Sequence, residues 1–448
     1  MDFNAFKAAV IAAAEEFGIT EYELYYQSAE GTSVSAFKHG LHQFTSSTEG
    51  GVCFRAIVGG KMGYASTEAM NAEEAKAIVA RAADNAAALE SEDAVFLGEG
   101  GQEYEPLQLK EVQIPATDKL ISTMLDAHEK LYAASPAVID GCSTQAIAER
   151  SEMAIYNSKG LDLHYSHAIT GLVNVAVVTD GKEMANNFEV KLGDLDQINL
   201  EELADKAAQG ALRKLGGEVA PTGQYPVVFD PEAMASLLQT FAGVFSSEAA
   251  QKGLSKFADQ EGCVIASPVV TIVDDPFHKD NPMPINFDAE GSPTHCKNIV
   301  EKGELKTLLY NLKTAHKAGK KTTGNASKAG YNAAVAVRPF TMYLAGGKMT
   351  EEELLQKAGN GVFINSLSGL HAGANPISGD FSLQSAGFMI ENGMKTTPVK
   401  SFTVAGNFYE LLKNITDVAS NVTLPGAMGM TAFGAPTVLV EGLSVAGK

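Results

Sequence analysis

The histidines and cysteines are the residues of this chain best suited to metal or nucleophilic chemistry. Two histidine pairs are close in sequence: His39 and His42 in KHGLH, and His164 and His167 in LHYSH. Imidazole nitrogens are common metal ligands. In a β-strand, however, side chains three residues apart point to opposite faces. Because both pairs fall in strand-like sequence, we expect neither pair to chelate a metal.

A second group combines the thiols and imidazoles that zinc prefers, and its members are Cys263, His278, His295 and Cys296. Their spacing matches no compact zinc module, and each can also be explained as a core or loop residue. We therefore expect no metal and no other cofactor in this chain, and we keep this group as the alternative. The adjacent Asp274 and Asp275 precede a proline, a pattern that more often caps a turn than builds a site.

The motifs of several enzyme classes are absent from the sequence. There is no GxxxxGK[ST] phosphate-binding loop, no GxGxxG after a predicted strand and no HExxH zinc motif. The GxSxG turn that exposes a nucleophilic serine is also missing. These motifs therefore assign no activity to the chain.

A third group is GDFSLQSAGFMIENG, residues 379–393. A turn at its first two residues is followed by an alternating strand and a second turn at ENG. The segment is either a hairpin strand of the core or a strand that lines a groove. In the second case Gly379, Asp380 and Phe381 lie beside a peptide-facing edge, and they are our candidate substrate-binding residues.

Composition limits the class of protein. With 448 residues, 45% hydrophobic and 20% charged, the chain can bury a large core in two or three domains. Its 54 acidic and 34 basic residues give a net charge of −20, which repels nucleic acids. No apolar run approaches the ~20 residues of a membrane span, and the N-terminus lacks the basic region of a signal peptide. We expect a cytoplasmic protein with free cysteines and without a nucleic-acid or membrane partner.

Hydrophobic periodicity predicts the elements of the first half of the chain. Several short strands are expected between residues 21 and 58. Asn71 and Glu74 form a capping-box pattern at one helix start, and residues 91–113 are expected to connect two domains. Long alternating runs between 136 and 191 predict a large antiparallel sheet. The helices are expected over residues 3–17, 71–90, 117–134 and 199–215.

The second half opens on a short strand and a helix that begins at Asp230 and Pro231. We expect the segment SLLQTFAGVFSSEAAQKGLS to be the back half of an ordinary packed helix that runs into a turn, and we expect short helices near 350–359 and 407–416. Strands without regular βαβ alternation predict an α+β fold with mixed, largely antiparallel sheets and flanking helices. The expected units are an N-terminal α/β-like domain (1–110), a central antiparallel sheet with helices (111–220) and a strand-rich C-terminal domain (221–448).

Nearly the whole chain resembles the TldD/PmbA family, peptidase-related bacterial proteins once labelled modulators of DNA gyrase. The similarity is carried by an ordered set of segments: TSTEGGVCFRAIVGGKMGYAST, EAAQKGLS, TIVDDP, DAEGSPTHCKNIVEKGELKTLLYNLKTAHKAGKKTTGNA, GDFSLQSAGFMIENG, VAGNFYELLKNI and GAPTVLVEGLSVAG.

The resemblance implies that one branch of the family is a zinc peptidase. The TldD-like branch carries HExxxH on a helix, with a more C-terminal cysteine as a further ligand. Those two histidines and the glutamate correspond to Leu238, Gly243 and Gln239 in this chain. Leucine and glycine side chains offer no lone pair to a metal, and a neutral amide cannot take a proton from water. No histidine lies between His167 and His278, and no cysteine follows Cys296.

In lacking these residues, the chain resembles the PmbA-like, or TldE-like, branch of the family. The resemblance then implies a subunit without a zinc site that works with a zinc-bearing TldD-like partner, or forms a homodimer. The pair would cleave or trim unfolded peptides. It would support the maturation of ribosomal peptide antibiotics and the turnover of antitoxins. The alternative is a stand-alone homodimeric peptide-binding or scaffold protein with no catalysis.

Overall fold

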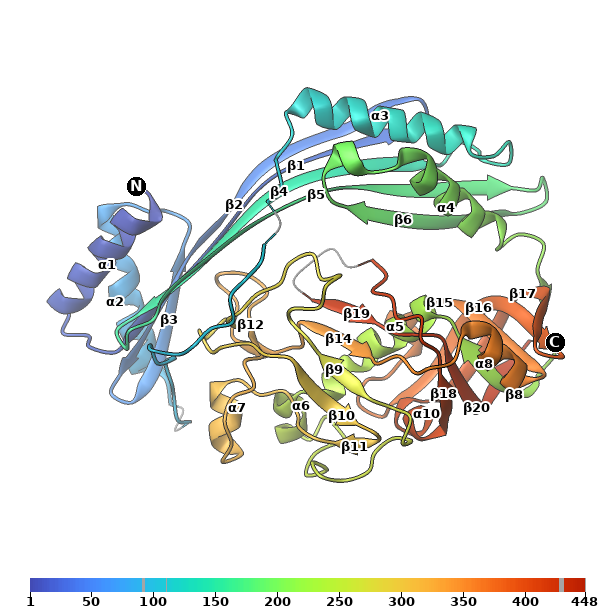
Figure 1. The fold of residues 1–448 in the computed structure, drawn as a ribbon. Coiled ribbons are helices and arrows are strands. Elements are labelled where there is room, and N and C mark those ends of the chain that lie inside the picture. The colour runs from blue at the N-terminus through green and yellow to red at the C-terminus, as the bar shows by residue number, and fades with distance from the viewer. Residues whose placement is uncertain (91–92, 110, 427–430, 448) are drawn as a thin grey trace.

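The computed structural model describes residues 1–90, 93–109, 111–426 and 431–447. A long curved sheet arches over a strand-rich C-terminal domain (Figure 1). Helices flank the sheets, which are mixed but largely antiparallel, so the predicted α+β fold is confirmed. Residue 110, where we placed a domain boundary, and residues 91 and 92 of the predicted connection lie outside the described part of the chain.

The arching sheet has six antiparallel strands in the order β3-β2-β1-β4-β5-β6. Three strands precede the connection around residue 100 and three follow it, so both parts of the chain share one continuous sheet. The strands are β1 (Tyr22–Phe37), β2 (Gly40–Val58), β3 (Lys61–Thr67), β4 (Ser143–Asn157), β5 (Asp162–Thr179) and β6 (Met184–Leu192).

The short strands expected between residues 21 and 58 are in fact the two long strands β1 and β2, so that prediction was wrong. Glycines suggested turns, but Gly31 and Gly50 lie inside the ladder, paired with Ser47 and Ser28. A Cβ at Gly50 would meet the backbone of Ser28 at 2.7 Å. Glycine here permits close approach of two strands and does not end them.

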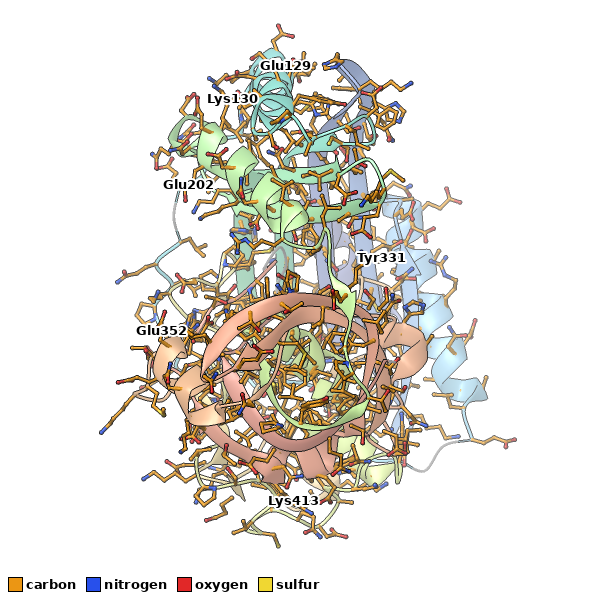
Figure 2. All side chains as sticks on the ribbon, turned by 90° about the vertical axis from the view of Figure 1, so that its right-hand side faces the viewer. Glu129, Lys130, Glu202, Tyr331, Glu352 and Lys413 are labelled. Atoms are coloured by element: carbon orange, nitrogen blue, oxygen red, sulfur yellow. The ribbon has the colours of Figure 1, made fainter. Side chains whose placement is uncertain are left out.

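Four predicted helices flank this sheet, and the structure confirms their existence. Two of them cover one end of the sheet, and two cover its outer face, where Glu129 and Glu202 point outward (Figure 2). Asn71 caps its helix by accepting a hydrogen bond from the Glu74 amide at 2.9 Å. The last helix ends at Leu212, before the expected residue 215. The helices are α1 (Phe3–Glu16), α2 (Ala72–Ala88), α3 (Thr117–Ala133) and α4 (Leu200–Leu212), with the 3-10 turn η1 (Leu195–Gln197).

The C-terminal domain is built on a closed barrel, because β20 pairs with both β8 and β17. Figure 2 shows the barrel strands as a ring. The barrel strands are β8 (Gly223–Phe229), β15 (Gly361–Ser368), β16 (Asp380–Glu391), β17 (Met394–Asn407) and β20 (Val438–Ala446), and β7 (Glu218–Val219) and β18 (Ile415–Val418) extend them.

A second, five-stranded sheet in the order β11-β10-β9-β14-β19 lies beside the barrel. Apolar side chains of both sheets and of the helix after β8 form the largest hydrophobic cluster of the described residues. The strands are β9 (Ile272–Asp274), β10 (Lys297–Glu301), β11 (Glu304–Leu305), β14 (Thr341–Leu344) and β19 (Ala432–Gly434), and β12 (Ala326–Ser327) pairs with β13 (Ala336–Val337).

The segment expected to be an ordinary helix that runs into a turn begins as a helix but then divides into further short pieces. Asp230 caps α5 (Pro231–Phe241) as predicted, but a 3-10 turn η2 (Ala242–Phe245) and the short α6 (Ser247–Gln251) follow. Leu309 exchanges backbone hydrogen bonds with Phe245 and Ser247, at 2.9 and 3.0 Å. This strand-like pairing takes the chain out of the helical path.

The helices expected near 350–359 and 407–416 are α8 (Glu351–Ala358) and α10 (Phe408–Asn414). Two helices were not predicted, α7 (Leu312–Lys317) and α9 (Leu370–Gly373). The capping box of Asn311 and Thr314 was the available signal for α7. No helix within the described ranges is both long and apolar enough to cross a membrane.

Candidate functional site

A cleft separates the inner face of the arching sheet from the C-terminal domain. It consists of a smaller cavity of about 390 Å³ and a larger one of about 810 Å³, which share Val190, Leu424 and Gly426. We call this continuous space the central cleft. Such volumes suit part of an extended peptide or a small ligand.

The edge strand β6 forms one wall of the central cleft. Among the described residues β6 pairs with no strand other than β5, which leaves its outer edge without a strand partner. The carbonyls of Asn186 and Phe188 accept side-chain hydrogen bonds from Lys214 and Asn187, at 3.0 and 3.3 Å. Apolar side chains of β6 border the cleft: Phe188 and Val190 are among the residues that line the smaller cavity, and Val190 and Leu192 are among those that line the larger one. Phe188 is 54% exposed. An open edge beside apolar side chains is the arrangement used for binding by strand addition.

Helix α5 forms the opposite wall of the smaller cavity through Ser236 and Gln239. Leu238 is buried in the core, and Gly243 is exposed with no atom within 4 Å of a Cβ built on it. Of the three positions that correspond to HExxxH, only Gln239 is among the described residues that line this cavity. Its amide can donate and accept hydrogen bonds but cannot act as a base.

Two carboxyl groups line the smaller cavity, and Lys214, outside its described lining, interacts with both of them. Burial raises the pKa of Glu189 on β6 and of Glu232 on α5, and each is opposed by nearby lysines. Burial lowers the pKa of Lys214, which faces Glu232, Asp230 and Glu189. The carboxyl groups lie at the wall beside Gln239 and give this end of the cleft an acidic lining.

The donor set of the smaller cavity does not fit a zinc ion of the HExxxH type. Its described lining residues include neither histidine nor cysteine, and their polar groups are two carboxyls, the Gln239 amide and the hydroxyls of Ser236 and Thr431. Across the described part of the chain, no three His, Cys, Asp or Glu side chains are grouped to hold a metal ion.

His167 lines the larger cavity and has one ring nitrogen without a hydrogen-bond partner among the described residues. It is 8% exposed, and that nitrogen is Nε2. Burial lowers its pKa, so the neutral imidazole is favoured. His164, three residues away on β5, is exposed, which places the two rings on opposite faces as expected. His39 and His42 are both exposed near the turn between β1 and β2.

The group of two cysteines and two histidines is spread over the five-stranded sheet and its loops. Cys263 is exposed, and its carbonyl accepts a hydrogen bond from Leu305 of β11 at 3.0 Å. His295 and Cys296 precede β10 at its other end. His278 lines the larger cavity, and its ring packs against Tyr343 at 5.0 Å. The structure does not gather them into one metal site.

The Asp274–Asp275 pair has structural contacts. Asp274 is fully buried and accepts hydrogen bonds from the amides of Phe340 and Thr341 and from Lys297 Nζ at 3.2 Å. Asp275 accepts a hydrogen bond from the Phe277 amide at 3.0 Å and so closes a turn. The first residue therefore joins strands, and the second shapes the loop that borders the cleft.

The predicted substrate residues Gly379, Asp380 and Phe381 lie at the start of β16. Phe381 is 3% exposed and packs near Phe241 of α5, with ring centroids 6.3 Å apart. Asp380 accepts a hydrogen bond from Asn407 at 2.8 Å. Each thus has a structural contact, and none lines the central cleft as described. Their contact with substrate stays a prediction. Phe188, Val190 and His167 were not predicted as site residues, since only folding places them opposite α5.

Three family models match the chain. They are the PmbA/TldA metallopeptidase domain 1 over residues 22–86, the central domain over residues 111–215 and the C-terminal domain over residues 222–447. The chain is 30% identical over 324 residues to a metalloprotease of Methanothermobacter thermautotrophicus, covering 69% of this chain and 68% of that protein. It is 26% identical over 279 residues to a TldD metalloprotease homologue of Buchnera aphidicola, covering 60% of this chain and only 57% of that protein.

Solved structures share the whole architecture. A candidate modulator of DNA gyrase from Thermotoga maritima superposes with a TM-score of 0.89 at 30% identity, covering 99% of this chain and 100% of that one. TldE from Thermococcus kodakarensis gives a TM-score of 0.86 with 99% and 100% coverage; at 22% identity this likeness supports the fold alone.

Proposed function

Since the chain belongs to the PmbA/TldD family of metallopeptidase-related proteins, we propose that it is the subunit of a TldD/TldE-type complex that lacks the zinc site. In this proposal it binds unfolded peptide segments in the central cleft, and a TldD-like partner supplies the zinc and the catalytic glutamate. The observation that carries the proposal is Gln239. It lines the smaller cavity, whose described donors do not match a zinc site of the HExxxH type, and the family resemblance matches it to the glutamate of the zinc-bearing branch.

The chain's own contribution to peptide processing is binding. The open edge of β6 would donate and accept backbone hydrogen bonds with an extended segment, which makes recognition independent of sequence. Phe188 and Val190 would contact alternate side chains of the peptide. The unpartnered Nε2 of His167 would hydrogen-bond to the peptide at the larger cavity. Most backbone groups of a folded protein are already paired within its own structure, so the expected substrate class is unfolded peptide.

The test is co-purification of the tagged chain with metal analysis and a peptide-cleavage assay. We expect the native host to yield a complex with an HExxxH-bearing relative, zinc only in that relative, and cleavage only by the complex. Cleavage by this chain alone, or about one equivalent of zinc per chain that is lost on changing Cys263 and Cys296 to serine, would refute the proposal. A homodimer that binds peptide and recovers no such relative would favour the scaffold alternative.

A further inference from the structure

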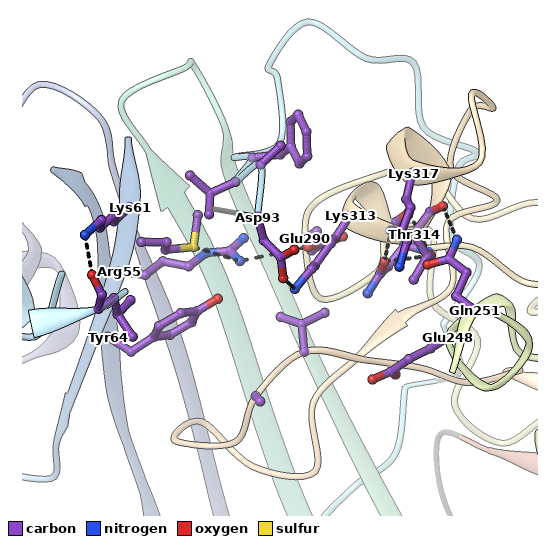
Figure 3. Close-up of a pocket in the computed structure, with 18 of the residues that line it drawn as sticks. Arg55, Lys61, Tyr64, Asp93, Glu248, Gln251, Glu290, Lys313, Thr314 and Lys317 are labelled. Carbon is purple, nitrogen blue, oxygen red and sulfur yellow. Dashed lines mark hydrogen bonds and ion pairs between the residues drawn. The ribbon is translucent and has the colours of Figure 1, made fainter. Parts of the chain in front are cut away.

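A second cavity of about 700 Å³ lies away from the central cleft, between the β2–β3 end of the arching sheet and helices α6 and α7 (Figure 3). We infer that this cavity, which we call the basic cavity, binds a small organic anion with an apolar body. It shares no described lining residue with the central cleft, and the proposal does not depend on the function proposed above.

The charge of the basic cavity is opposite to that of the whole chain. Of its described lining residues, Arg55 and four lysines are basic and three are acidic, whereas the chain carries a net charge of −20. A concave surface of one sign inside an oppositely charged protein concentrates ligands of the opposite sign.

The acidic side chains of the basic cavity are already engaged. Asp93 pairs with Lys313 at 2.8 Å, and Glu248 pairs with Lys252 at 2.6 Å. Glu290 is buried and accepts a hydrogen bond from the Leu312 amide at 2.8 Å. Arg55 also pairs with Glu290, so the positive balance left for a ligand comes from the two lysines of the described lining that form no ion pair among the described residues, Lys61 and Lys317.

Arg55 provides the donor that points to a ligand. The residue is 4% exposed, its Nε donates to Glu23 at 2.7 Å, and its Nη1 lies 3.9 Å from Glu290. Its Nη2 atom is buried and has no hydrogen-bond partner among the described residues. Buried donors of a charged group are almost always satisfied, and a carboxylate or phosphate oxygen in the cavity would satisfy this one. Figure 3 shows Arg55 reaching toward Glu290 and Asp93 at the centre of the cavity.

Apolar side chains line another part of the cavity and would contact the body of the ligand. Met62, Val95, Phe96, Ala334 and Val335 line the cavity around the charged groups. Cavities that combine an apolar wall with a few placed polar groups bind amphiphilic small molecules. The ligand class is therefore a carboxylate or phosphate that carries an aliphatic or aromatic body.

The test uses anilinonaphthalene sulfonate, a fluorescent aromatic anion, and its displacement from the full chain by octanoate. Ala334→Trp fills the cavity from an exposed position, and Lys317→Glu reverses a charge at its exposed rim. We expect Ala334→Trp to abolish the octanoate-displaceable signal and Lys317→Glu to weaken octanoate binding about tenfold. Val190→Trp, in the central cleft, is the matched control and should leave octanoate binding unchanged. Circular dichroism and thermal unfolding verify that each variant is folded.

Three results would overturn the inference. One is a wild-type chain that binds no octanoate. Another is unchanged octanoate affinity in folded Ala334→Trp and Lys317→Glu variants. The third is displacement by octan-1-ol as effective as by octanoate, which would mean that the cavity selects apolar bodies without regard to charge.

Discussion

Arg55 of the arching sheet and Glu290 of the C-terminal domain face each other in the interior, with Nη1 and Oε1 3.9 Å apart. Glu23, beside Arg55 on the neighbouring strand, completes a buried group of two carboxylates and one guanidinium. The attraction of Arg55 for Glu290 joins parts of the chain that are far apart in sequence, and it holds the sheet end against the C-terminal domain.

We predict that Arg55→Met lowers the free energy of unfolding by about 3–5 kcal/mol, because it removes the guanidinium that pairs with both Glu23 and Glu290. Urea unfolding followed by circular dichroism measures the change. The control is Lys76→Met, which breaks the exposed pair of Lys76 and Glu16 and should have little effect. Equal midpoints for both variants would show that the buried group does not stabilise the domain contact.

Asp230, the cap of α5, should make stability depend on pH. Burial, followed by the nearby Glu232 and Glu351, raises the pKa of its carboxyl from 3.8 to about 7. A raised pKa means that the folded chain favours the protonated acid. The stability that this protonated carboxyl contributes is thus complete below about pH 4 and is lost as the pH rises to about 7. At about 1.4 kcal/mol per pKa unit, the loss is on the order of 4 kcal/mol.

Asp230→Asn keeps a cap acceptor for the Ala233 amide but removes the titration. We expect its unfolding free energy to fall less than that of the wild type between pH 4.5 and pH 7.5. Urea unfolding at three pH values tests this, and parallel profiles for the two proteins would contradict it.

Gly379 should not tolerate a side chain. It has φ +85°, and a Cβ there would lie 2.4 Å from Cδ2 of Tyr409. We predict that Gly379→Val destabilises the chain by about 1–3 kcal/mol through backbone strain and displacement of that ring. Gly243→Ala, where no atom lies within 4 Å, is the matched control and should cost little. A Gly379→Val variant as stable as the wild type would contradict this structural role and would favour the earlier prediction that Gly379 contacts substrate.

Phe188→Asp should weaken peptide binding about tenfold without changing stability, because the side chain is 54% exposed at the wall of the central cleft. Fluorescence anisotropy of a labelled unfolded peptide measures the affinity. Met394→Asp, which replaces an equally exposed apolar residue on β17, controls for the general loss of surface hydrophobicity. The same affinity for Phe188→Asp and wild type would remove β6 from the binding surface.

The sequence predicted features that depend on local interactions. Asp230 and Asn71 mark helix starts because a cap bonds to an amide three residues away. Alternating hydrophobicity gave the strands and the α+β class, since each strand has one buried face. The glycines in β1 and β2 led us to predict turns that do not exist. Gly31 and Gly50 lie inside the strands, where their positions depend on contacts with neighbouring strands and not on local turns.

The missing histidines between His167 and His278 are a property of the sequence alone. What opposes Gln239 is decided by tertiary structure: closure of the barrel and the arch of the six-stranded sheet bring Val190 of β6 to the same cavity. The pairing of Leu309 with Phe245 likewise breaks the helix that periodicity predicts. Composition and spacing reflect the local conformational preferences of residues that are near one another in sequence. The cleft and the buried Arg55 group arise from long-range strand pairing and burial, which no local pattern encodes.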